Sequence, residues 1–367
     1  MTNQLSKISD KKDSEKLLSV GMDFEEEKRA GSFLQQDNYM MLAEGFSDSF
    51  ELLGVDEAFK RYPEVKKKYY GRAFKEIGKE FEPGTEGGYF IRVKKGKTVE
   101  LPIQACLLLK TQGFQQKVHN IVIIEEGAKA NIITGCATAT GINEGFHLGI
   151  SEFFIAKDAQ LNFTMIHSWE ENISVRPVTC VLLDENATFI SNYVCLNPVK
   201  DVVMYPTALI KGKGAKAYFS SLLLAHPGST LDVGGRTILN AEGAHSEITA
   251  RAVSLGGTIY ARGQLIAKSK NVQAHIDCNA LLVSEKGIIK AIPELETELK
   301  DVQLSHEAAI GKIKKEEIEY LCTRGMTPEE AQAVILRGFM NIDLMHIPAA
   351  IKDSINFIKE KTLAEGL

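Results

Sequence analysis

The order of hydrophobic and polar positions divides the chain into three parts. Residues 1–83 carry apolar residues at mixed spacings of three and four, which indicates helices. Residues 84–300 form short runs rich in Ile, Val, Phe, Thr and Tyr with Gly, Asn and Asp between them, as is typical of strands and turns. Residues 301–367 return to helical spacing, and Thr327–Glu330 predicts a capped helix start. We therefore expect a β core between an N-terminal and a C-terminal helical domain.

The β core contains an internal repeat. A near-constant period of about 28 to 31 residues indicates stacked structural units. Units of strand and turn without a helical pattern favour a β-solenoid over helical repeats. A β-propeller is the alternative, although its repeats are usually longer. The repeated feature is a turn followed by a small residue and then a strand, and it places that residue at Ala128, Ala159, Ala187, Ala215, Ala244 and Val272.

Composition excludes several classes of protein. The 367 residues are 44% hydrophobic, which is enough for a large core. The net charge of −5 with both signs mixed gives no indication of nucleic-acid binding. No stretch approaches the apolar length of a transmembrane helix, and the polar N-terminus lacks the apolar region of a secretory signal. A cytoplasmic location is therefore the expectation.

The six cysteines are widely spread and form no CxxC pair. This spacing argues against a structural zinc site and against a disulfide framework in a chain of this length. A free cysteine is most often a small buried hydrophobic residue, and that is the expectation for each of the six except Cys278.

The segment Asn271–Ile313 carries the candidate chemistry. Cys278 lies in a run that looks like a strand, and His306 and Glu307 follow it 28 and 29 residues later. Thiolate, imidazole and carboxylate are the side-chain types that hold borderline metals, but only the fold can bring these three together. The residues alone leave other readings open. Cys278 can fill an inner layer, His306 can be a structural histidine, and Glu307 can lie at a helix N-terminus.

This segment resembles the SufB/SufD family, the scaffold proteins of the SUF iron–sulfur cluster assembly system. In SufB-type members, His-Glu within a HEAT run follows the cysteine at this same spacing, and here the run is SHEA at Ser305–Ala308. SufD-type members carry Ser-His-Gly at that position, so Glu307 makes this chain SufB-like. The resemblance covers most of the chain and continues, in the family's order, through Gly54–Gly71, Gly87–Ala105, Val122–Cys136 and Leu161–Trp169.

The resemblance implies a right-handed parallel β-helix core flanked by helical segments. It also implies a scaffold rather than an enzyme, which builds a nascent, labile iron–sulfur cluster of 4Fe–4S type and passes it to acceptor apoproteins. The family works with a SufC-like ABC ATPase, and a minimal system of this kind implies a homodimer formed through the β-helix. Neither nucleic acid nor membrane is an expected partner.

The resemblance also implies roles for particular residues. Cys278 and Glu307 of one copy, with His306 of the other, become the expected metal ligands. Cys278 then needs thiolate character and access, and so a place at an interface. The C-terminal helical region becomes the ATPase-binding surface, with Glu317, Tyr320, Arg324, Arg337 and Phe339 as the candidate contacts.

One family feature has no clear match. SufB relays sulfur from an internal cysteine in the middle of the core, whereas our register places Asp184 there, four residues after Cys180. Cys180 is the candidate substitute. No P-loop motif is present, so ATP hydrolysis is expected in the partner. Two other functions stay open: a β-helix carbohydrate lyase, and a structural SufD-like subunit without metal.

Overall fold

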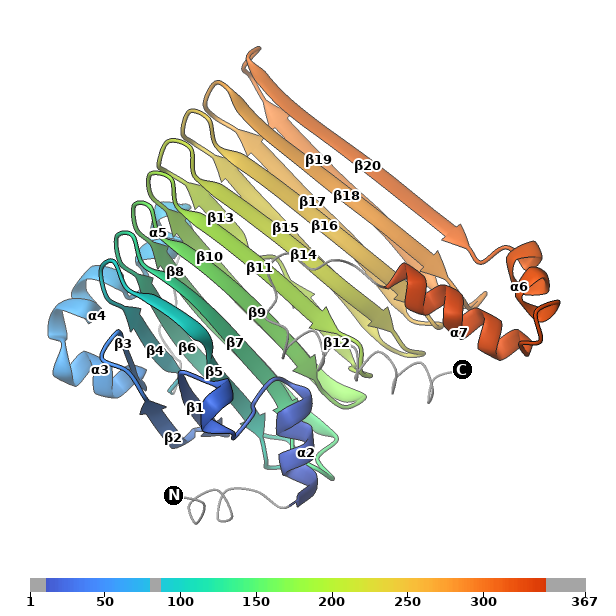
Figure 1. The fold of residues 1–367 in the computed structure, drawn as a ribbon, viewed down its shortest axis with the longest axis horizontal. Helices are drawn as coiled ribbons and strands as arrows, with labels where there is room; N and C mark the ends of the chain where they lie inside the picture. The colour runs from blue at the N-terminus through green and yellow to red at the C-terminus, as the bar shows by residue number, and fades with distance from the viewer. Residues whose placement is uncertain (1–10, 80–86, 341–367) are drawn as a thin grey trace.

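The chain forms a parallel β-solenoid of about eight coils with helices at both ends of the sequence (Figure 1). The structure is a computed structural model, and it describes residues 11–79 and 87–340. Two ten-stranded sheets, here called sheet A and sheet B, form the two walls of the solenoid. The mainly β fold class predicted from the sequence is confirmed.

The antiparallel pairs β1–β2 and β3–β4 each lie within one wall. From β4 onward the strands alternate between the walls, with β12 and β13 together taking one place, so that neighbours within a sheet come from successive coils. Sheet A has the order β2 (Tyr39–Gly45), β1 (Gly31–Gln36), β5 (Thr98–Leu109), β7 (Lys129–Thr138), β9 (Gln160–Ser168), β11 (Thr188–Cys195), β14 (Lys216–Ala225), β16 (His245–Ser254), β18 (Val272–Leu282), β20 (Val302–Lys312). Sheet B has the order β19 (Ile288–Thr297), β17 (Thr258–Ala267), β15 (Thr230–Leu239), β12 (Asp201–Met204), β10 (Asn172–Leu183), β8 (Glu144–Ile155), β6 (Gln115–Ile124), β4 (Tyr89–Val93), β3 (Phe50–Gly54), with β13 (Thr207–Ile210) between β10 and β15. The helices are α2 (Lys11–Ser19), the short 3₁₀ helix η1 (Glu26–Lys28), α3 (Val55–Arg61), α4 (Pro63–Tyr69), α5 (Arg72–Glu76), α6 (Lys315–Cys322) and α7 (Pro328–Phe339).

The predicted repeat marks one corner of the solenoid. Each repeated small residue is at most 1% exposed and lies at the start of a sheet A strand. The residue before it has positive φ in every coil, as at Gly127, Asp158 and Asn186. Glycine, asparagine and aspartate tolerate this left-handed conformation best, which explains the turn chemistry of the repeat. A backbone hydrogen bond from one corner to the next, such as Asp158 N–H to the Glu185 carbonyl at 2.9 Å, stacks the coils.

Helices cover part of the outer face of each wall. α2 and α7 pack on sheet A, where Leu17 and Leu336 join one apolar cluster with Leu222. A Cβ added to Gly135 would lie 2.6 Å from the Val20 carbonyl oxygen, so only glycine lets the segment after α2 approach β7 this closely. α3, α4 and α5 cover the outer face of sheet B. The solenoid therefore has apolar side chains on both faces of its sheets over much of its length.

The structure corrects the expected domain boundaries. Helices are present in the N-terminal part, but Gly31–Gly54 forms β1, β2 and β3, which join both sheets. At the other end, β20 extends to Lys312, so the solenoid continues past residue 300. The capped start of α7 is confirmed, because Thr327 and Glu330 form a reciprocal capping box. The expected helical residues 341–367 lie outside the described part of the chain.

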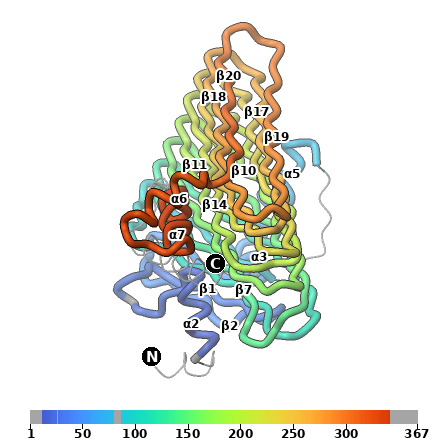
Figure 2. The backbone as a smooth tube through the Cα atoms, turned by 90° about the vertical axis from the view of Figure 1, so that its right-hand side faces the viewer, coloured from blue at the N-terminus to red at the C-terminus, as the bar shows by residue number. Residues whose placement is uncertain are grey.

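The C-terminal end of the solenoid is open. In the part of the chain that the structure describes, β19 and β20 are the last strands of their sheets, and each has one edge without a partner strand. Figure 2 shows these two strands side by side with no further coil in front of them. Leu295 of β19 is 38% exposed and Ile310 of β20 is 44% exposed. No helix among the described residues is long and apolar enough to cross a membrane.

Candidate functional site

Cys278 points into the solenoid, just below its open end. Along β18, Ile276, Cys278 and Ala280 are buried, whereas His275 and Asp277 between them are partly exposed. This is the alternation that the sequence predicts for a strand with one inner and one outer face.

A narrow cavity lies beside the Cys278 thiol. It is lined by small residues, such as Ala250 and Ala308, by larger apolar ones, such as Ile276, and by Glu307. The thiol is 5% exposed, and burial, with the Asp277 carboxylate nearby, raises its pKa to about 11. In a single copy Cys278 is therefore a protonated, enclosed thiol, which corrects the expectation of an accessible thiolate.

His306 and Glu307 lie on β20, the strand next to Cys278. The parallel register pairs His306 with Ile276, Glu307 with Asp277 and Ala308 with Cys278. Side chains at paired positions point the same way, so His306 belongs to the inner face and Glu307 to the outer face. Both are exposed, because β20 is the last strand of its sheet. The alternative that Glu307 begins a helix is wrong, because α6 starts only at Lys315.

One copy of the chain does not bring the three candidate ligands together. β20 is a continuous strand, and the two neighbouring side chains leave it in opposite directions. Within residues 11–79 and 87–340, no group of three or more His, Cys, Asp or Glu side chains is placed to hold a metal ion. By register His306 belongs to the inner face and Glu307 to the outer face, but it is Glu307, and not His306, that lines the narrow cavity beside Cys278.

Polar contacts fix the outer face around Glu307. The Asp277 carboxylate accepts from Arg251 at 2.7 Å and from the Asn279 side-chain amide at 2.7 Å. Two residues earlier on β18, the His275 Nδ1 lies 2.8 Å from the hydroxyl of Ser305 on β20. Asp277 and His275 are thus engaged within the chain, while Glu307 has no ion pair among the described residues.

Cys180, the candidate sulfur relay, lies elsewhere. It is on the outer face of sheet B, beneath α5, and its thiol donates to the Ala73 carbonyl at 3.2 Å. Burial raises its pKa to about 12. Because Cys278 faces the interior from sheet A, the structure does not bring these two thiols together.

The interior contains another set of sulfur and nitrogen side chains that sequence reasoning did not select. Cys136, His167 and Cys195 occupy the same position in three successive coils, with His167 between the two thiols. All three are at most 2% exposed. Their spacings of 31 and 28 residues follow the repeat, so the period itself was the signal that could have found them. They stack in the middle of the core, several coils from Cys278.

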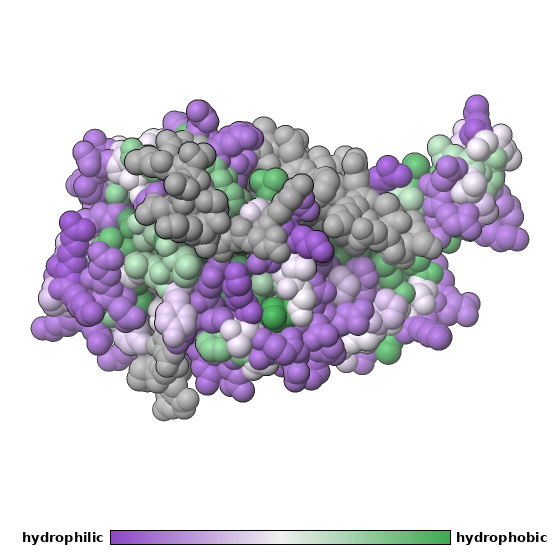
Figure 3. Space-filling model, turned by 90° about the horizontal axis from the view of Figure 1, so that it is seen from below, coloured by the Kyte–Doolittle hydropathy of each residue, from purple (hydrophilic) through white to green (hydrophobic). Residues whose placement is uncertain are grey.

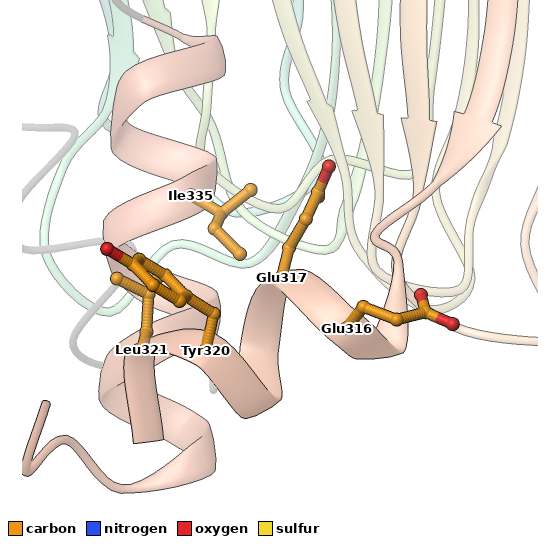
Figure 4. Close-up of a pocket in the computed structure, with 5 residues that line it drawn as sticks. All are labelled: Glu316, Glu317, Tyr320, Leu321 and Ile335. Atoms are coloured by element: carbon orange, nitrogen blue, oxygen red, sulfur yellow. The ribbon is translucent and has the colours of Figure 1, made fainter. Parts of the chain in front are cut away.

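The two C-terminal helices border a shallow, open hollow of about 460 Å³ (Figure 4). Tyr320 and Leu321 of α6 face Ile335 of α7 across it, and Glu316 and Glu317 lie at its rim. The Tyr320 side chain is 59% exposed. On the face seen in Figure 3, hydrophilic residues predominate and apolar residues form small separate patches.

The predicted ATPase contacts divide into two groups. Glu317 and Tyr320 line this hollow, and the Arg324 guanidinium holds the Tyr320 hydroxyl at 3.2 Å. Arg337 is exposed, whereas Phe339 is partly buried against the apolar cluster on sheet A. Two of the five predicted contacts therefore line the hollow, whereas the Phe339 side chain packs toward the solenoid.

Comparison with known proteins shows the same family along almost the whole chain. The model of the SUF system FeS cluster assembly SufBD core domain matches residues 107–339. The Iron-sulfur cluster assembly SufBD family protein of Archaeoglobus fulgidus is 46% identical, over 94% of this chain and 93% of its own length.

Two further relatives extend the comparison. The SufBD family protein of Methanothermobacter thermautotrophicus strain Delta H is 40% identical, over 91% of this chain and 83% of its own length. The Iron-sulfur cluster assembly protein SufB of Bacillus subtilis is 29% identical, over 71% of this chain and 57% of its own length. The match to the family model and the identity to these relatives agree with the solenoid fold. This chain therefore belongs to the SufBD family of SUF-system iron–sulfur cluster assembly proteins.

Proposed function

We propose that this chain is a scaffold on which a nascent, labile iron–sulfur cluster of 4Fe–4S type is assembled and passed to acceptor apoproteins in the cytoplasm. The observation that carries the proposal is the register of the last two sheet A strands. It places Cys278 beside the strand that holds His306 and Glu307, at the open end of the solenoid. The cluster is the cargo of this protein, and no catalytic residue is assigned to the chain itself.

The ligand types suit a cluster that must leave again. Permanent clusters are held by four cysteine thiolates, whereas this end of the solenoid offers one thiol, one imidazole and one carboxylate. Nitrogen and oxygen ligands bind the iron of a cluster less tightly than thiolate does, so a mixed set favours release. Iron bound at Cys278 would also displace the thiol proton, because a coordinating cysteine is bound as thiolate.

A second copy of the chain completes the proposed site. Because β20 presents His306 and Glu307 on opposite faces, one copy cannot direct both side chains at the same cluster. The free edges of β19 and β20 and the exposed Leu295 and Ile310 support a two-fold pairing at this end. Cys278 and Glu307 line the same narrow cavity, whereas His306 does not line it, so in the arrangement we propose Cys278 and Glu307 come from one copy and His306 from the other.

A SufC-like ABC ATPase is the proposed partner of the C-terminal helices. The hollow between α6 and α7 is apolar at its centre and acidic at its rim, and it exposes Tyr320. Tyrosine in a pocket with a polar rim is typical of the energetic centre of a protein interface. ATP hydrolysis in the partner would act on α6, which follows β20 directly, and so on the coil that carries the proposed ligands.

Anaerobic reconstitution tests the proposal. The purified chain is supplied with Fe²⁺ and sulfide, and its visible spectrum is compared with that of Cys278→Ser, Glu307→Ala and, as a control, Cys322→Ser in α6. We expect sulfide-to-iron absorption bands in the wild type and the control, and their loss in the other two variants. Equal bands in all four proteins would show that the cluster forms elsewhere. A wild type without bands would instead support a metal-free structural subunit.

A further inference from the structure

A second cavity lies on the opposite wall of the solenoid from α6 and α7. It is a groove of about 660 Å³ between α4–α5 and the turns that follow the sheet B strands β4, β6, β8 and β10. Figure 1 shows α5 beside these turns, at the upper left of the molecule. The volume is that of a typical small-molecule site, whose range is roughly 300–1,000 Å³. The groove is separate from the cluster site, because it faces outward from sheet B.

The groove carries an excess of positive charge. Six basic and four acidic side chains line it in the described part of the chain. Three of the four acids are neutralised within the groove. Arg92 pairs with Glu125, and Lys95 pairs with Glu126 at 2.7 Å. Glu76 pairs with both Arg72 and Lys211. Lys67 and Lys68 of α4 make no ion pair among the described residues, and the remaining acid is Asp184 alone. An anion entering here meets cations that no internal carboxylate already occupies.

The floor of the groove is aromatic and aliphatic. Tyr69 and Phe154 meet edge to face, with ring centroids 4.7 Å apart. Ile123 and Leu182 extend this apolar surface. The Lys68 ammonium lies 5.0 Å from the centre of the Tyr69 ring, at the boundary between floor and charged wall. A flat apolar ring can therefore lie on the floor while a negative group reaches the lysines.

Hydrogen bonds to a buried carboxylate hold α4 and α5, the helical wall of the groove, in place. Glu152 of β8 is fully buried, and its carboxylate accepts from the backbone N–H groups of Gly71 at 2.6 Å and Ala73 at 2.7 Å. Its Oε1 also lies 2.9 Å from the His119 Nε2. Gly71 has a φ of 73°, which lets the chain turn sharply between α4 and α5. The wall is thus fixed before any ligand arrives, as binding sites require.

We propose that this groove binds an anionic ligand with a flat aromatic ring whose face packs on the apolar floor, the chemistry of a nucleoside phosphate. The proposal gives a role to the segment Gly54–Gly71, which contributes α3 and α4 and to which the cluster chemistry assigns none. It does not depend on cluster assembly, because no groove residue belongs to the Cys278 site.

Fluorescence anisotropy with N-methylanthraniloyl-AMP, without metal and at low salt, tests the proposal on the full chain. We expect saturable binding to the wild type that unlabelled AMP displaces. Lys67→Glu with Lys68→Glu should weaken it about tenfold or more, the effect of losing two favourable charges. Tyr69→Leu should weaken it while leaving the charges in place, and its folding is checked by circular dichroism.

The matched control is Lys286→Glu with Lys290→Glu at the far end of the solenoid. This pair resembles Lys67 and Lys68, because the Lys290 ammonium lies 5.5 Å from the centre of the Tyr260 ring and Lys286 is exposed nearby. We expect wild-type binding in this control. The proposal is overturned if the probe does not saturate, if the groove variant binds as the wild type does, or if inorganic phosphate displaces the probe as well as AMP does. It is also overturned if a poly-glutamate peptide displaces the probe more strongly than AMP, which would indicate an acidic protein partner.

Discussion

At the scale of single residues, the environment of Cys278 sets the reactivity of the proposed site. The thiol lies in a narrow cavity lined by Ala250, Ala261 and Ala308 together with larger apolar residues such as Ile276. Such surroundings leave room beside the sulfur but supply no cation to stabilise a thiolate, apart from Arg251, which already pairs with Asp277. The thiol is thereby protected from general oxidation until iron or a second copy changes its surroundings.

Alkylation of the metal-free protein checks this protection. Because only the thiolate reacts and the pKa of Cys278 is about 11, we expect very slow reaction with iodoacetamide at neutral pH. The rate should rise about tenfold with each unit of pH until it approaches that pKa. In denaturant, where the pKa returns to about 8.5, reaction at neutral pH should be fast. A folded protein that reacts at neutral pH as fast as the denatured one contradicts a buried, neutral thiol.

At the scale of elements, the two terminal strands determine whether copies can pair. An exposed edge with apolar side chains is a surface that natural proteins normally block, and here β19 and β20 leave it open in the described structure. The double variant Leu295→Lys with Ile310→Lys would put charges into the proposed seam, the contact between the free edges of β19 and β20 in two copies. Desolvation of these charges is costly. We expect light scattering to show a dimer for the wild type and a monomer for this double variant.

The control for the seam is Val203→Lys on β12, whose side chain is 45% exposed on the wall of the solenoid. It should remain dimeric, because it adds a similar charge away from the open end. A monomeric wild type, or a double variant with unchanged mass, would show that the copies do not pair through these strands.

The helix pair α6–α7 gives a separate prediction about the ATPase. Tyr320 is the exposed aromatic residue of the hollow, so Tyr320→Ala should weaken binding of the SufC-like subunit about tenfold or more. Val334→Ala on α7 removes a similarly exposed apolar side chain that does not line the hollow, and it should bind normally. Surface plasmon resonance with the immobilised ATPase measures both, and equal affinities would place the interface elsewhere.

At the scale of the whole molecule, stacking explains what the sequence could and could not predict. The corner residues follow one period because each must fit under the next, so Ala128 and its successors identify the solenoid directly. The strand β1 has no such signal. Phe33 packs inside the solenoid and Leu34 packs in the cluster under α2, so both faces are apolar and the alternation typical of a strand is lost.

The repeat predicts part of the site, but apolar side chains on both faces of the strands limit the rest of the prediction. The separation of Cys278 from His306 is about one coil, so their adjacency follows from the period, and the opposite directions of His306 and Glu307 follow from strand geometry. Alternation alone does not say which face is inner when helices cover the outer one. Cys180 lies on an apolar face of β10, but that face is the one under α5.

The central claim is that two copies share each cluster site, and heterodimers of complementary variants test it most directly. One heterodimer pairs a Cys278→Ser copy with a His306→Ala copy, and a second pairs Cys278→Ser with Glu307→Ala. If a site takes one ligand from each copy, one of these heterodimers retains an intact site, although every variant homodimer has none. We expect the first heterodimer to bind about half of the wild-type iron and sulfide after reconstitution, because His306 then comes from the copy that still has it. If the second heterodimer binds iron and sulfide instead, Glu307 is the ligand that comes from the other copy. If neither heterodimer binds more iron and sulfide than its variant homodimers, the result contradicts a shared site.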